Sequence, residues 1–226
     1  DCEMSRHIRV LLAPPAAAAL LIGAAPAWAG AFTIDDLFNT GVDAAGNVLP
    51  GGSDDPHYLM TDAPSIGTFV PGKVALSGVF PLTAGLWFPN DGDSAWIGPQ
   101  ADPNNPSQNV TGLPGGYRFT TTFTLPADVD LASVSITGRW SIDDTAPDPI
   151  RLNGVDTGIT LADAGDDFRS LHDFAITSGF VAGTNTLDFR LINAGIGSNP
   201  VGLRVDDLVG MYDLLEVVEE PGPGTD

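Results

Sequence analysis

Side chains that carry oxygen gather near both ends of the chain, and their types suit a calcium ion. Calcium takes about six to eight oxygen ligands from carboxylates, amide side chains and backbone carbonyls. Asp and Asn are concentrated in the loop-like stretch 39–55, and an aspartate pair follows an apolar pattern late in the chain. We therefore predict one structural calcium with ligands drawn from Asn39, Asp43, Asn47, Asp54, Asp55, Asp206 and Asp207. The alternative is that these acids only solvate the surface.

The late aspartate pair is notable for its position in a strand pattern. Val201, Leu203 and Val205 alternate at period two, so continuing the alternation places Asp207 on the apolar face. A carboxylate on that face needs a partner, a β-bulge or a metal ion. Asp206 falls on the polar face together with Arg204, and an ion pair between them is the alternative to metal binding.

Three aromatic side chains have the type and position to bind a sugar. Sugars stack their apolar faces on aromatic rings while polar side chains bond to their hydroxyls. Trp87 and Trp96 flank a polar loop, and Tyr58 stands at a loop end. Trp140 shares its strand face with Ile136 and Ile142, which assigns it to the core. We predict ligand binding by Tyr58, Trp87 and Trp96, with burial of all three as the alternative.

Residues for catalysis are sparse. Gly92-Asp93-Ser94 is similar to the Gly-Asp-Ser block of a hydrolase family, but that chemistry needs a following helix and a late Asp-x-x-His. Here the Asp-x-x-His motif ends at His57, before the serine. Beyond the export signal only His57 and His172 remain, too few for a multi-histidine zinc site. We predict no catalytic residues and no enzyme activity; a hydrolase with a carboxylate pair is a less favoured alternative.

Charge and cysteine content exclude several classes of protein. The formal net charge is −20 and Lys73 is the only lysine, so the surface repels phosphate backbones and anionic lipids. Cys2 is the only cysteine and precedes the predicted mature chain. Disulfides and thiolate metal sites are therefore excluded in that mature chain.

The first residues have the layout of a secretory signal peptide. Two arginines precede an apolar stretch at 11–25, and Ala27-Trp28-Ala29 is a small-residue cleavage motif. The apolar stretch is short and contains two prolines, which disfavours a membrane anchor. The predicted organisation is a signal peptide with upstream residues at 1–29, one β-sandwich domain at 30–212, and an acidic, Pro/Gly-rich, disordered tail at 213–226.

Elements able to position these side chains are strands, because Gly and Pro recur too often for a helix of useful length. Apolar and polar residues alternate at period two over 117–125, 133–142, 187–191 and 201–205. Asn153-Gly154 suits a type I′ hairpin turn, because both positions tolerate positive φ. Turn signals arrive about every ten residues, as in an all-β sandwich.

From Phe38 to Gly210 the chain resembles a domain of exported bacterial proteins of the PEP-CTERM (exosortase-sorted) type, which has a galactose-binding-like fold. The resemblance implies an all-β jelly-roll β-sandwich, a place at the cell surface or in the exopolysaccharide matrix, glycan binding, and one calcium joining the N-terminal loop to the last strand. Sorted members end in Pro-Glu-Pro, an apolar helix and a basic cluster, and the last residues here lack them. The motifs that carry the resemblance are Asn39-Thr-Gly-Val-Asp43, Asp55-Pro-His-Tyr58, Trp87-Phe-Pro-Asn-Asp91, Ser94-Ala-Trp-Ile97, and stretches at 138–154, 183–193 and 199–210.

These observations together predict a secreted or cell-surface, non-catalytic module that is calcium-stabilised and binds glycan or exopolysaccharide. Other surface proteins are further expected partners; nucleic acid and a membrane span in the mature chain are not expected. The alternative is a structural or adhesive protein–protein module. An exposed Trp87/Trp96 pair would favour glycan binding, a long unpaired edge strand would favour assembly, and a pocket with two close carboxylates would favour an enzyme.

Overall fold

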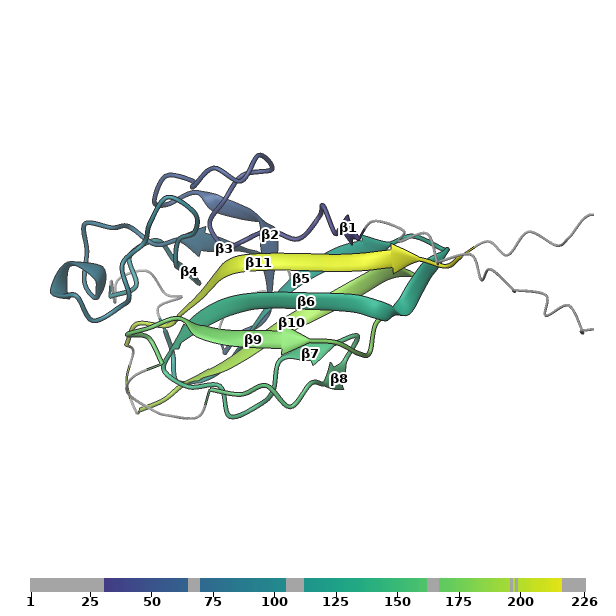
Figure 1. The fold of residues 1–226 in the computed structure, drawn as a ribbon. Coiled ribbons are helices and arrows are strands. Elements are labelled where there is room, and N and C mark those ends of the chain that lie inside the picture. Colours follow the sequence, from purple (N-terminus) through teal and green to yellow (C-terminus); the bar gives the residue numbers. More distant parts are fainter. Residues whose placement is uncertain are drawn as a thin grey trace, which may run out of the picture.

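The computed structural model describes residues 31–64, 70–104, 112–161, 167–195, 197 and 199–216. In these segments the chain is all β, and its helical structure is a single 3₁₀ turn, η1 (Leu82–Ala84). The predicted all-β fold class is confirmed (Figure 1). The strands are β1 (Phe32–Thr33), β2 (Asp54–Asp62), β3 (Val70–Val74), β4 (Ile97–Gly98), β5 (Gly115–Leu125), β6 (Val129–Asp143), β7 (Arg151–Leu152), β8 (Val155–Asp156), β9 (His172–Ile176), β10 (Gly183–Asn193) and β11 (Gly202–Leu214).

The strands form one curled antiparallel sheet in the order β8-β7-β10-β5-β2-β3-β4-β11-β6-β9, with β1 added beside β11. The curl brings β10 and β5 behind β11, β6 and β9, so that two layers face each other (Figure 1). From β5 onward, successive strands or hairpins alternate between the two layers, as they do in a jelly roll. Each layer therefore receives strands from distant parts of the chain.

The core between the layers follows the predicted alternation. Along β6, Val134, Ile136, Trp140 and Ile142 point inward and are all buried. Trp140 lies 5.9 Å, centroid to centroid, from the ring of Phe189 on β10, which joins the two layers. The inward positions predicted on β5, β10 and β11 are likewise buried, because each strand places alternate residues on the core side.

The hairpin between β7 and β8 has the predicted turn. Asn153 has φ 53° and Gly154 has φ 79°, the positive values that a type I′ turn requires. The side chain of Asn153 also donates to the Asn185 Oδ1 atom at 2.8 Å and accepts from the Thr186 amide at 2.9 Å. Asn153 is therefore structural twice over, in the turn and as a clamp onto β10.

A second, smaller apolar cluster covers the outer face of β11. Trp87 and Trp96 stack with their ring centroids 4.3 Å apart, beside Ala75, over the start of this strand. Gly202 makes the close approach possible: a Cβ on it would lie 2.7 Å from the Trp87 Cη2 atom and 3.1 Å from the Trp96 ring. At this end β11 is thus buried on both faces.

Replacing Gly202 with Ala should destabilise the domain by about 1–3 kcal/mol, because the new methyl group overpacks a fully buried indole pair. Urea denaturation measures the change. Gly116→Ala is the matched control, since a Cβ on Gly116 meets no atom within 4 Å. Equal midpoints for Gly202→Ala and the wild type would contradict the packing described here.

Two further features bear on the predicted organisation. The last strand continues to Leu214, slightly beyond the predicted domain end at 212. The predicted signal peptide at 1–29, and the tail from residue 217 onward, lie outside the described residues. No helix in the described part of the chain is long and apolar enough to cross a membrane.

Candidate functional site

The three aromatic residues predicted to bind sugar are all buried, so they form no exposed stacking platform. Tyr58 and Trp96 are 0% exposed and Trp87 is 1% exposed. Their polar atoms also have partners: the Tyr58 hydroxyl donates to the Phe38 carbonyl at 2.8 Å, and the Trp96 indole donates to the Phe88 carbonyl at 2.8 Å. The alternative stated from the sequence, burial, is the arrangement found. The residues from 75 to 96 fold back over β11 and carry both indoles inward.

The seven predicted calcium ligands do not converge on one point. Asp43 accepts from Ala45 and Asn47 within its own turn, and Asp54 pairs with Lys73. Asp55 is fully buried, and burial raises the pKa of its carboxyl, yet backbone amides of Gly41, His57 and Tyr58 bond to it. Among the residues described, no group of three or more His, Cys, Asp and Glu side chains is placed to hold a metal ion. The predicted set is therefore wrong as a single site.

The late aspartate pair lies opposite to the prediction. A bulge between Asp206 and Val209, with Asp207 at φ 50°, reverses the alternation, so Asp207 is exposed and Asp206 is buried. The Nη2 atom of Arg139 lies 2.8 Å from a carboxylate oxygen of each. Asn39 joins the same cluster, accepting from the Leu208 amide at 2.9 Å and donating to the Asp206 Oδ1 atom at 3.5 Å. An arginine thus occupies the position that the sequence assigned to a metal.

Arg204, predicted on the polar face, is fully buried because loops cover that face. Its Nε atom donates to the Ser94 hydroxyl at 2.8 Å, and its Nη2 atom donates to the Asp91 Oδ2 atom at 2.6 Å. Its Nη1 atom donates to the Pro89 carbonyl, and the guanidinium lies 5.2 Å from the Phe88 ring centroid. These contacts hold the loop 88–96 against β11.

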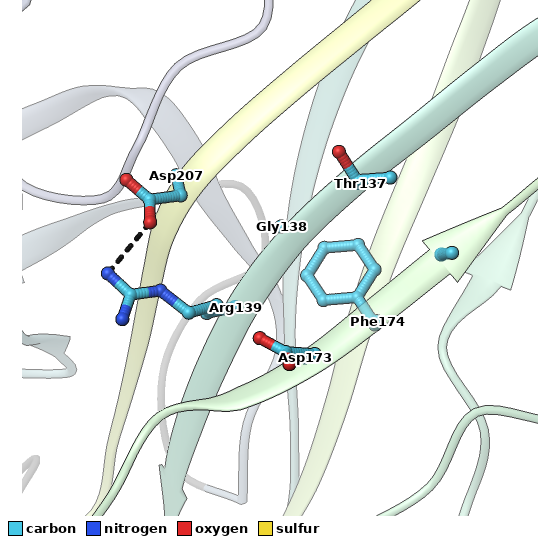
Figure 2. Close-up of a pocket in the computed structure, with 7 residues that line it drawn as sticks. Thr137, Gly138, Arg139, Asp173, Phe174 and Asp207 are labelled. Carbon is cyan, nitrogen blue, oxygen red and sulfur yellow. Dashed lines mark ion pairs between the residues drawn. The ribbon is translucent and has the colours of Figure 1, made fainter.

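A groove of about 560 Å³ runs over the outer face of β6 and β9 (Figure 2). Arg139 of β6 is the register partner of Asp173 on β9, and Asp207 faces Arg139 from the bulge of β11. The floor is low because Gly138 and Ala175 are small. The groove is lined by Thr137, Gly138, Arg139, Asp173, Phe174, Ala175 and Asp207.

Donors and acceptors stand close together in this groove. The buried Nε atom of Arg139 has no hydrogen-bond partner among the described residues, while its Nη2 atom is held by Asp206 and Asp207. Asp173 and Asp207 supply acceptor oxygens, and Thr137 supplies a hydroxyl. Sequence reasoning placed Arg139 and Thr137 on the outward face of their strand but missed the groove. The pairing of β6 with β9 carried no recognisable local signal.

A smaller pocket of about 140 Å³ lies farther along the same face of β6, where the strand ends. Asp143 is 6% exposed there, and its Oδ2 atom accepts from the Trp87 indole at 2.7 Å. Burial, together with a hydrogen bond and the charge of Asp144, raises the pKa of Asp143 to about 8, even though the Trp87 bond opposes the shift. Asp143 is therefore largely protonated at neutral pH.

This pKa has a consequence for stability. Because the folded-state pKa lies above the unfolded value of 3.8, the contribution of Asp143 is fully present at low pH and is lost as pH rises to about 8. Asp143→Asn keeps an uncharged side chain that accepts from Trp87. We expect this variant to be more stable than the wild type at about pH 8 and to lose that advantage near pH 4. Melting temperatures across this range measure the difference, and parallel curves would contradict the assignment.

Comparisons with known proteins give two structural likenesses. No protein-family model and no curated protein matches the chain. A family 35 carbohydrate-binding module from Clostridium thermocellum is similar at 14% identity and a TM-score of 0.31, covering 53% of this chain and 78% of that one. A family 35 carbohydrate-binding module from an environmental isolate is similar at 14% identity and a TM-score of 0.28, covering 46% of this chain and 76% of that one.

Proposed function

We propose that this protein is an exported, non-catalytic carbohydrate-binding module, and that glycan lies in the groove over β6 and β9. The observation that supports the proposal is the set of hydrogen-bonding side chains around this groove. Asp173, Asp207 and the Nε atom of Arg139 border a floor of small residues. A sugar hydroxyl both donates and accepts, so it can bond to a carboxylate and to a guanidinium in the same site.

The shape of the groove suits an extended ligand. Strands provide a rigid floor, and the Arg139 side chain is held from one side by Asp206 and Asp207. A ligand that enters therefore meets a largely ordered site, which reduces the entropy lost on binding. Gly138 and Ala175 let a sugar ring approach the backbone of β6 and β9 closely.

The charge of the groove favours an uncharged glycan. Asp173 and Asp207 line it and Asp206 lies beneath, whereas Arg139 is the one cation among its lining residues. The whole chain adds a formal net charge of −20. Polysaccharides rich in uronic acids are repelled at this surface, so we propose a neutral polysaccharide of the cell surface or its matrix as the ligand.

Export and surface location belong to the same proposal. The predicted signal peptide at 1–29 supports them, together with the resemblance to exosortase-sorted proteins. A glycan of the exopolysaccharide matrix is the partner such a location offers. The absence of cysteine after Cys2 is compatible with a domain held by its two packed layers.

The two other function classes receive less support. The strands at the ends of the sheet path are short, β8 with two residues and β9 with five, which disfavours assembly by strand addition. Asp143 and Asp144 do share a pocket, but they are adjacent and hydrogen-bond to each other. Glycosidase carboxyls must flank the scissile bond from separated positions, so this pair does not fit that chemistry.

A glycan array followed by calorimetric titration tests the groove. Asp173→Ala and Thr137→Ala should each weaken binding to a neutral glycan about tenfold, the loss of one or two hydrogen bonds. Asp62→Ala is the matched control, because this exposed aspartate lies on β2 and pairs with Arg118. Unchanged affinity in both groove variants would exclude this groove, and no binding to any glycan would contradict the proposed function.

Calcium stabilisation remains a prediction from the sequence. N–H groups already bond to Asp43 and Asp55, and Arg139 pairs with Asp206 and Asp207, so a calcium ion would have to displace these partners. We therefore expect the melting temperature to differ by less than about 2 °C between EGTA and excess calcium. A rise of several degrees that Asp206→Asn abolishes would instead show that calcium replaces Arg139 at this cluster.

A further inference from the structure

The small pocket at the end of β6 is separate from the groove. Between them, the Ser141 hydroxyl donates to the Asp167 carbonyl at 2.6 Å, so the segment that carries Phe168 crosses this face of β6. The pocket measures about 140 Å³, close to an engineered cavity of about 150 Å³ that holds one benzene ring in another protein. It is lined by Phe80, Pro81, Leu86, Trp87, Asp143, Asp144, Phe168, Asn199 and Pro200.

The lining combines apolar walls with a few polar groups, the composition typical of a small-molecule site. Phe80, on the η1 side, is 38% exposed and forms an accessible wall. The carboxyl of Asp143 is held by the Trp87 indole. The carboxyl of Asp144 accepts from the Ala194 amide at 2.8 Å, which leaves it acceptor capacity.

We propose that this pocket binds one uncharged polyhydroxylated ring, such as a single sugar residue, with the protonated Asp143 carboxyl as donor and Asp144 as acceptor. The apolar walls cover the ring faces while the two carboxyls bond to its hydroxyls. This extends the proposed glycan binding to a second site, and it does not require the groove.

Protonation of Asp143 controls this site. Asp144 is the only other charged residue in the lining; the walls from the 80–87 segment, Phe168, Asn199 and Pro200 are uncharged. Among the described residues no basic side chain forms an ion pair with either carboxyl, so deprotonation would place two negative charges side by side in a mostly apolar pocket. A ligand hydroxyl would then lose its donor, and affinity should fall at high pH.

The indole of Trp87 provides a direct reporter, because its N–H bonds to Asp143. We expect its proton and nitrogen NMR signals to shift with a pH midpoint near 8, while the signal of core Trp140 stays unchanged. Methyl glycosides of common neutral sugars are the probes. At about pH 6 at least one should shift the Trp87 signal, and its affinity should be about tenfold weaker at about pH 9.

Variants separate the pocket from the groove. Asp143→Asn, which imitates the protonated acid, should bind the glycoside equally at both pH values, and Phe80→Ala should weaken binding at both. Asp173→Ala in the groove should leave the Trp87 response intact. The inference is overturned if no neutral glycoside shifts Trp87 in the folded protein, or if the affinity does not depend on pH. A stronger response to methylammonium than to any glycoside would also overturn it, because the pocket would then bind cations.

Discussion

The buried guanidinium of Arg204 is the constraint on which the outer side of this sandwich depends. A buried arginine must have its donors satisfied, because an unpaired charge in the interior is far more costly than an ordinary lost hydrogen bond. Ser94, Asp91 and the Pro89 carbonyl all accept from it, and Phe88 covers it. Burial alone would raise the pKa of Asp91, but hydrogen bonds from Asp93 and Arg204 lower it below its ordinary value. The 88–96 loop is therefore held to β11 by an ionic contact.

Several other features follow from the position of that loop. It holds Trp96 against Trp87, and the two indoles then require Gly202 beneath them. Trp87 in turn directs its N–H toward Asp143. Burial of Asp143 near Asp144 is thus a consequence of the same covering loops, and so is its raised pKa. A chain of contacts connects the ion pair on β11 to the chemistry of the small pocket on β6.

The outer face of β6 has separate regions because different segments reach it. Near its middle, Thr137 and Arg139 remain accessible beside β9 and form the groove with Asp207. Farther along, the segment at Asp167 crosses the strand, and beyond it the 80–87 residues enclose the small pocket. One strand face therefore supports an open site suited to an extended ligand and an enclosed site suited to a single ring.

Local pattern was sufficient to predict much of the fold. Period-two alternation predicted the inward faces of β5, β6, β10 and β11, and it assigned Trp140 to the core. Asn153-Gly154 predicted its hairpin because the turn needs two residues that tolerate positive φ. These features depend on neighbours in the sequence, so the residues themselves carry the information.

Tertiary structure decided what covers each face, and that determined the candidate sites. Alternation identified two faces of β11 but could not show that loops bury the polar one, where Arg204 lies. The bulge after Asp206 exchanged the expected places of the two aspartates, and Arg139 reached both of them. Tyr58, Trp87 and Trp96 were read as exposed for the same reason. Burial and strand register arise from contacts between residues far apart in the chain, and composition and spacing along the chain do not encode those contacts.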